Sequence, residues 1–198
     1  MRPISEYFQK EDYSYHYEEP GCLAKMEQAI VSLITKTVPD FSREPVYLCI
    51  GTDRATGDCL GPLVGTLLKG LLPRANIFGT LENPAHAINL GDVIGEINRD
   101  FKSPLIVAID ACLGKPHRIG FINIKEGSIR PGTALQKVLP PVGDFHISGV
   151  VNCGGMLEHM VLQNTRLYIV YQMAEVIVRS LFLAHLRLEK LKLNQECS

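Results

Sequence analysis

The sequence lacks the motifs that mark several common classes of protein. Its six cysteines are dispersed and include no CxxC pair, which excludes a zinc-finger pattern and argues against a disulfide scaffold. Neither GxGxxG nor a P-loop GK[ST] signature occurs, so the chain carries no phosphate-binding loop of a known nucleotide-binding type. Cysteines within apolar stretches are typical of small buried thiols in a reducing compartment.

Strong charge and long apolar runs are also missing. The formal net charge is −1, which provides no basic field for nucleic acid and no cationic face for a membrane. The chain does not open on a basic segment followed by an apolar stretch, and no apolar run approaches about 20 residues. We therefore expect a soluble intracellular protein with neither nucleic acid nor a membrane as a partner.

What is present fits one α/β domain. The chain has 198 residues, of which 46% are apolar, enough for a single full core. Apolar periodicity predicts alternating helices and strands. The predicted helices cover residues 21–36, 59–72, 87–99, 149–163 and 173–193, and the predicted strands cover 46–50, 76–80, 105–109, 120–125 and 167–170. We expect a mostly parallel sheet in a domain spanning residues 21–198.

Residues 1–20 have a different composition. They are polar and rich in tyrosine, with Tyr13, Tyr15 and Tyr17 close together before a Glu-Glu-Pro stop. This segment is interpreted as an N-terminal arm that packs on the body or on a neighbouring copy, or else as a disordered tail. If the arm packs on a neighbouring copy, the protein forms a homo-oligomer.

Residues 46–62 are the most informative segment. A short apolar strand stops at Gly51 and enters a polar loop that contains Asp58 and leads into a helix. Ligands of open α/β sheets bind at this carboxyl edge of the strands. Asp110 directly follows the apolar run 105–109, so neighbouring strands would bring both aspartates to one rim. The plainer alternative is that Asp58 only caps the helix that follows.

Two carboxylates at one rim suit two kinds of chemistry. They can form a general acid/base pair whose pKa values repulsion drives apart, or they can supply oxygen ligands to a divalent metal. His146, predicted in a loop before helix 149–163, is the third candidate. A histidine with two carboxylates would suit one transition metal of the zinc or nickel class. The expected cofactor is therefore either none or one such ion.

The two aspartate segments resemble known peptidases. The motif TGDCLGP at residues 56–62 and AIDACL at residues 108–113 are similar to the catalytic loops of the germination protease that degrades small acid-soluble spore proteins. That resemblance implies that Asp58 and Asp110 are catalytic. Over residues 25–190 the chain resembles the YyaC-type sporulation protein family.

The same loop is similar to the hydrogenase-maturation endopeptidases. This second resemblance implies a three-layer α/β/α fold of the phosphorylase/hydrolase-like type. It also implies a nickel site at Asp58, Asp110 and His146. The chain departs from that family at Thr52, where asparagine is usual, and at Gly57, where an acidic residue is usual.

Together the resemblances imply an endopeptidase of sporulating bacteria. It would act on a protein or peptide substrate in the cytoplasm of the mother cell or forespore. An Asp pair would catalyse the hydrolysis, either alone or with the help of a bound metal ion. The alternative is a catalytically silent protein that keeps the fold and serves as a metal-binding, structural or regulatory sporulation protein.

Overall fold

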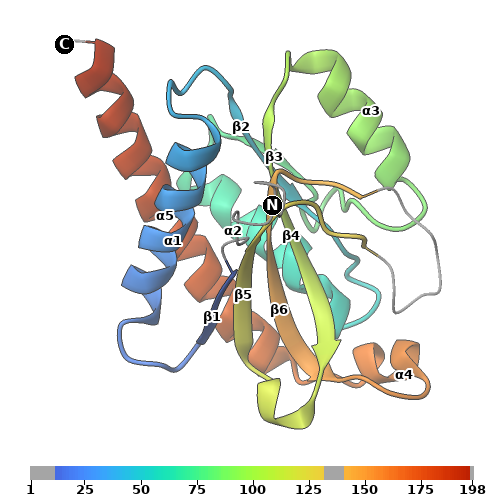
Figure 1. Ribbon diagram of the computed structural model, residues 1–198. Helices are drawn as coiled ribbons and strands as arrows, with labels where there is room; N and C mark the ends of the chain where they lie inside the picture. The colour runs from blue at the N-terminus through green and yellow to red at the C-terminus, as the bar shows by residue number, and fades with distance from the viewer. Residues whose placement is uncertain (1–11, 132–140, 197–198) are drawn as a thin grey trace, which may run out of the picture.

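A six-stranded sheet forms the centre of the protein in a computed structural model that describes residues 12–131 and 141–196. The strand order is β1-β5-β6-β4-β2-β3 (Figure 1). The strands are β1 (Asp12–His16), β2 (Pro45–Cys49), β3 (Asn76–Phe78), β4 (Leu105–Gly114), β5 (Phe121–Glu126) and β6 (Phe145–Cys153). Strands β6, β4, β2 and β3 run parallel, and β5 is antiparallel to both of its neighbours.

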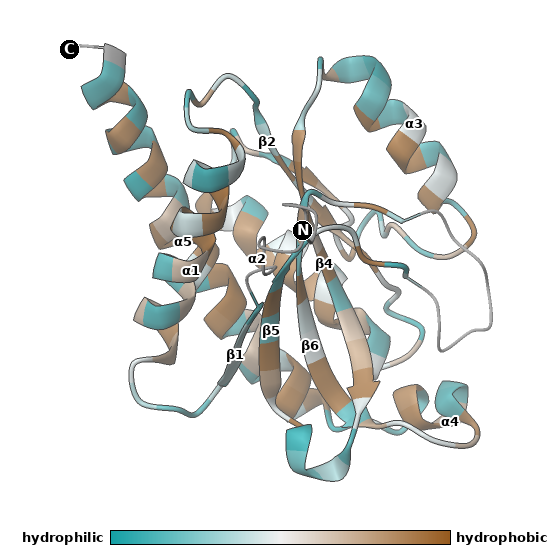
Figure 2. Ribbon diagram, viewed as in Figure 1, coloured by the Kyte–Doolittle hydropathy of each residue, from teal (hydrophilic) through white to brown (hydrophobic). Residues whose placement is uncertain are grey.

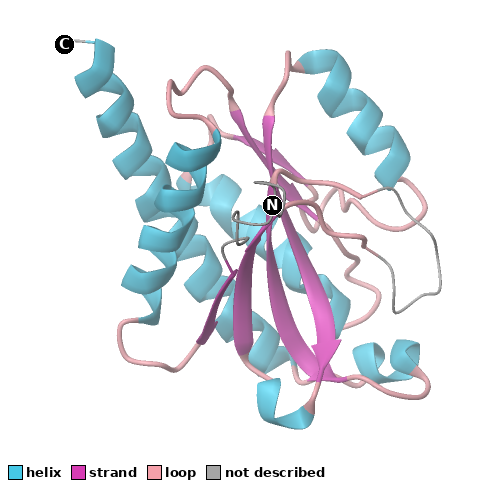
Figure 3. Ribbon diagram, in the orientation of Figure 1, coloured by secondary structure: helices cyan, strands magenta, loops and turns pink. Residues whose placement is uncertain are grey.

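Helices cover both faces of the sheet. One face carries α1 (Cys22–Thr37), α2 (Leu60–Leu71) and α5 (Leu167–Glu196), and α3 (Leu90–Asp100) lies on the other (Figure 3). The short α4 (Glu158–Gln163) lies near the carboxyl ends of the strands, and 3₁₀ turns occupy η2 (Gly57–Cys59) and η3 (Pro116–Arg118). The predicted three-layer α/β/α fold with a mostly parallel sheet is thus confirmed.

Alternation along the central strands divides the core in two. Odd-numbered residues such as Tyr47 and Ile109 pack in the large cluster under α1, α2 and α5, and even-numbered ones such as Leu48 and Ala108 pack under α3. Apolar residues accordingly gather along the strands and the inner sides of the helices (Figure 2). Each fully buried Leu or Ile side chain stabilises the folded state by roughly 1.5–3 kcal/mol relative to leaving it exposed to water. This two-sided burial fixes the register of the strands that carry the two aspartates.

Part of the predicted arm belongs to the sheet. Residues Asp12–His16 form β1, which pairs with β5 so that Tyr15 lies opposite Ile122. Residues 1–11 of the arm lie outside the described part of the chain.

The prediction of a helix over residues 149–163 is wrong. Residues Phe145–Cys153 form β6, and the helix is confined to α4. β6 pairs with β4 on one side and β5 on the other, so its backbone hydrogen bonds are made within the sheet. At Gly149 a Cβ would lie 2.4 Å from a methyl carbon of Leu60 in α2, which shows how closely the helix layer approaches this strand.

Two further predictions fail near the carboxyl ends of the strands. β4 does not stop before Asp110 but runs to Gly114, because β6 pairs with it along that length. Residues 167–170, predicted as a strand, begin α5. The buried residues of α5 recur at helical spacing and continue the pattern from Val170 through Ile177 to Leu181.

α5 is long and apolar enough to cross a membrane by length and composition, with a mean hydropathy of 1.5 in its most apolar window. The core helix of a soluble protein meets the same criterion, and 44% of that window is buried inside the fold. Among residues 12–131 and 141–196, α5 is the one helix that meets this criterion of length and hydropathy.

Candidate active site

The loop that carries Asp58 is held by backbone contacts. Gly51, at φ +139°, donates its N–H to the carbonyl of Ala85 at 2.9 Å, and Thr52 donates to the carbonyl of Asp58 at 3.1 Å. A Cβ on Gly51 would lie 2.0 Å from that same Asp58 carbonyl oxygen, so only glycine fits. The loop is therefore folded back on the end of β2.

Asp58 does not cap the helix that follows it. The residue before α2 is Cys59, and it makes no side-chain capping hydrogen bond. Asp58 instead lines a cavity of about 330 Å³ at the carboxyl edge of the sheet. The other polar residues of the lining come from its own loop, from the loop before α3 and from α4: Thr52, Arg54, His86, His159 and Gln163.

Burial changes the acidity of Asp58. Loss of solvation raises its pKa from 3.8 to about 6, and a hydrogen bond from the Thr52 backbone opposes that shift. The carboxyl group is mostly ionised at neutral pH and protonated in mild acid.

Asp110 lies on β4, and its side chain is only 7% exposed. One carboxyl oxygen accepts the Ala111 N–H at 2.8 Å. Burial raises the pKa of Asp110 well above its usual value, and the nearby charge of Asp58 raises it further. The structure thus brings these two aspartates close enough to interact, and burial holds the pKa of both carboxyl groups above the usual value.

The thiol next to this pair is not an activated nucleophile. Cys112 lies two residues after Asp110, and burial raises the pKa of its thiol to about 11, against a hydrogen bond with Ser148. A thiol with that pKa is almost entirely protonated at neutral pH. Ser148 itself lies opposite Asp110 on β6.

His146 does not join the two aspartates. It lies in β6 opposite Ala108, and its Nδ1 donates to the carbonyl of Gly127 at 2.8 Å. It is two residues before Ser148, roughly 7 Å along the strand. Within the described ranges no three His, Cys, Asp or Glu side chains form a metal-binding group. Asp58, Asp110 and His146, the residues expected to hold zinc or nickel, therefore form no group that could bind such an ion. His146 is the second residue of β6, at the amino end of that strand, whereas the Asp58 cavity lies at the carboxyl edge of the sheet.

Two histidines that share the cavity with Asp58 were not singled out from sequence. His86 accepts the Ile88 N–H at Nδ1 and lies in the loop after β3, where Ala85 forms a bridge with Ile50. His159 is on α4. Neither has a local spacing motif. Only the position of His86 in the sequence could have indicated it, because it follows the predicted strand 76–80, which ends at the same edge of the sheet as the strand before Asp58.

Comparison with known proteins places the chain in a family. Residues 14–180 match a family described as "Protein of unknown function (DUF1256)". The chain is also 45% identical over 162 residues to the "Uncharacterized protein YyaC" of Bacillus subtilis (strain 168), covering 81% of this chain and 79% of that protein.

The chain belongs to this YyaC-type DUF1256 family. The DUF1256 match runs from β1 into α5 and so includes both aspartates and the cavity at the end of β2. The YyaC-type family expected from the sequence is confirmed.

The DUF1256 fold should lose stability as Asp58 ionises. A pKa raised in the folded state means that the native protein holds a proton that the unfolded chain has released, so the stability that Asp58 contributes is fully present below about pH 4 and is lost as the pH rises through about 6. The shift corresponds to about 3 kcal/mol at most. Asp58→Asn should flatten this fall, measured by urea unfolding between pH 4 and 8. An unchanged slope in the variant would contradict the burial of an ionisable group here.

Proposed function

We propose that the protein is an endopeptidase of sporulating bacteria that hydrolyses a protein or peptide in the cytoplasm of the mother cell or forespore. The observation that carries the proposal is that Asp58 lines a cavity while its charge raises the pKa of the buried Asp110. Paired carboxyl groups with unequal pKa values supply both members of an acid/base couple. The resemblance of both segments to the germination protease supports the reaction type.

The two aspartates have different roles at neutral pH. Asp58, ionised above about pH 6, takes a proton from water as the water oxygen attacks the peptide carbonyl. Asp110 is protonated, so the two carboxyl groups together hold two protons once Asp58 has taken one from water. The departing amine receives one of these two protons as the C–N bond breaks. The rate should therefore rise through about pH 6 and fall where Asp110 ionises.

The remaining residues of the cavity suit the charge that develops during this reaction. Arg54, His86 and His159 line the same cavity as Asp58, and each can donate a hydrogen bond. An oxyanion formed from the peptide carbonyl is stabilised by donors of this kind. In the proposed reaction these side chains stabilise the oxyanion.

Cleavage can be tested without a known substrate. The purified protein is incubated with a peptide mixture made by Lys-C digestion of a lysate of sporulating Bacillus cells, and new termini are identified by mass spectrometry. We expect cleavage by the wild type and a fall of about 100-fold or more in Asp58→Asn, because a positioned general base contributes about that factor.

Asp53→Asn is the matched control for this experiment. It makes the same chemical change in the same loop, at an exposed side chain that does not line the cavity. Full cleavage by Asp58→Asn would overturn the acid/base assignment. No cleavage by any protein, the wild type included, would favour the catalytically silent structural or regulatory alternative.

A further inference from the structure

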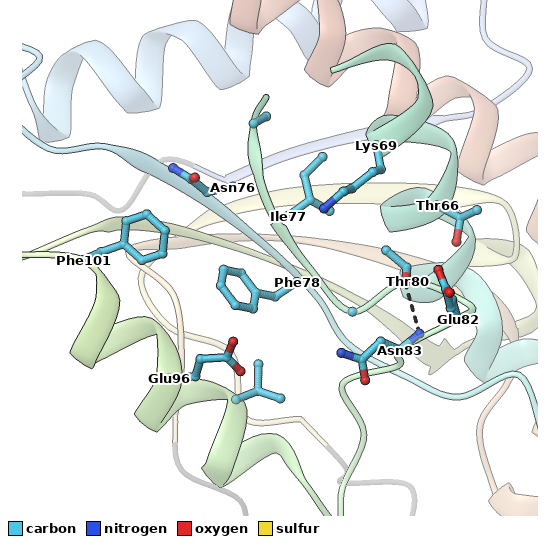
Figure 4. A pocket seen from close by; sticks show the side chains of 13 residues that line it. Thr66, Lys69, Asn76, Ile77, Phe78, Thr80, Glu82, Asn83, Glu96 and Phe101 are labelled. Carbon is cyan, nitrogen blue, oxygen red and sulfur yellow. Dashed lines mark hydrogen bonds between the residues drawn. The ribbon is translucent and has the colours of Figure 1, made fainter. Parts of the chain in front are cut away.

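The outer edge of the sheet at β3 borders a groove. β3 ends the strand order, and on its outer side no strand of the described ranges pairs with it. An unpaired edge offers backbone N–H and C=O groups to another extended chain. Beside it lies a groove of about 500 Å³, lined by residues 75–80 and by residues of α2, of α3 and of the segments that follow β3 and α3 (Figure 4).

The groove has an apolar wall and charged borders. Phe78 and Phe101 meet edge to face at 6.2 Å between ring centroids, next to Val93. In Figure 4, Lys69 from α2 and Glu96 from α3 point into the groove from opposite sides. This arrangement suits a strand whose side chains alternate between the two sides.

The charge of the groove favours a basic segment. Its charged lining residues are two carboxylates, Glu82 and Glu96, and one ammonium group, Lys69. Glu96 is exposed on α3, next to the aromatic wall. A side chain directed toward α3 is thus best matched by an aliphatic stem that ends in a positive charge.

The end of the groove leads toward Asp58. β3 continues into the turn Thr80–Asn83, where the Asn83 N–H donates to the Thr80 hydroxyl at 3.1 Å and the Leu81 N–H donates to Thr66 of α2 at 2.8 Å. Three residues after this turn, His86 lines the Asp58 cavity. A chain that follows the β3 edge in the direction of the strand leaves it at the side of the sheet where the cavity opens.

We propose that the groove binds an extended peptide segment with basic side chains, which adds to the sheet as a strand along β3. The role of this segment as the substrate chain rests on the proposed endopeptidase function, since the groove would hold the substrate next to the cleavage site. Recognition would combine backbone pairing with contacts to Glu96 and the Phe78–Phe101 wall.

The binding test uses two fluorescein-labelled hexapeptides, one alternating valine with lysine and the other alternating valine with glutamate. Anisotropy is measured on the full-length Asp58→Asn protein, so that cleavage cannot consume the probe. The lysine peptide should bind at least about tenfold more tightly, a difference of about 1.4 kcal/mol. Adding Glu96→Lys should remove or invert that preference.

Asp100→Lys is the matched control, because it makes the same charge change at an exposed position of α3 that does not line the groove. It should leave both affinities unchanged. Equal binding of the two peptides, or equal effects of Glu96→Lys and Asp100→Lys, would overturn the proposed basic segment.

Backbone pairing is tested by two lysine probes that carry N-methyl groups on either the odd or the even residues. Strand addition uses the N–H groups of one edge of the peptide, so one methylated probe should lose binding and the other should keep it. Equal behaviour of the two would exclude a strand on β3. Because binding is read without cleavage, a protein that binds the probe yet cuts nothing would overturn the proposed function and leave the groove assignment standing.

Discussion

Asp110→Asn should make the protein more stable at neutral pH and, at the same time, inactive. Asp110 is buried, and both burial and the charge of Asp58 hold its pKa well above the usual value. Asn is a neutral group of the same size, so it removes the free-energy cost of keeping this buried carboxyl protonated but cannot exchange a proton. The expected result is a Tm several degrees higher at pH 8, with a fall in cleavage of about 100-fold or more.

The sign of the stability effect follows from proton linkage. In the wild type, the contribution of a carboxyl with a raised pKa is fully present below pH 4 and is lost as the pH rises toward the folded-state pKa. Differential scanning calorimetry of the wild type and Asp110→Asn should therefore give similar Tm values near pH 4 and diverging ones above it. A gap of equal size at every pH would mean that Asp110 is not the protonated partner.

Gly61→Ala should destabilise the protein by about 3 kcal/mol or more. A Cβ at this position would lie 2.1 Å from the carbonyl oxygen of Ile50 and 2.7 Å from its nitrogen. Both are backbone atoms at the end of β2, so they cannot rotate away as a side chain would. Relief requires α2 to move from the strand, and the Asp58 loop lies between these two elements.

Gly70→Ala provides the comparison, since Gly70 is in the same helix and a Cβ there would meet nothing within 4 Å. It should leave the stability unchanged or raise it by up to about 0.5 kcal/mol, because alanine has a higher helix propensity than glycine and Gly70 lies in the last turn of α2. Urea unfolding of both variants measures the two effects. If Gly61→Ala were as stable as Gly70→Ala, the close contact between α2 and β2 would not exist as described.

The proposed groove and the proposed acid/base pair lie on opposite sides of β2, and both would serve cleavage of the same substrate. β4 brings Asp110 to one side of the Asp58 loop, and β3 brings the bridge at Ala85 and the cavity residue His86 to the other. A substrate strand on β3 would thus approach the cavity from the side opposite Asp110.

Local sequence determined the elements whose patterns have one reading. The run Val46–Cys49 before Gly51, with the helical spacing of apolar residues after Pro62, admits little besides strand, loop and helix, and α1, β2, α2, β3 and β5 lie where they were predicted. The same strand–loop–helix pattern predicted Asp58 as a site residue, because ligands of open α/β sheets bind where a strand ends in such a loop.

Only the tertiary structure decided the conformation of residues 145–153 and 167–170. Both are short apolar runs whose pattern fits a strand or a helix, so the neighbours made the choice. β6 lies between two strands that use its backbone groups, and Val170 begins a helical face that fits the core. The same choice placed His146 near the amino end of β6 and away from the rim, because strand register and burial are properties of the whole sheet and of no single segment.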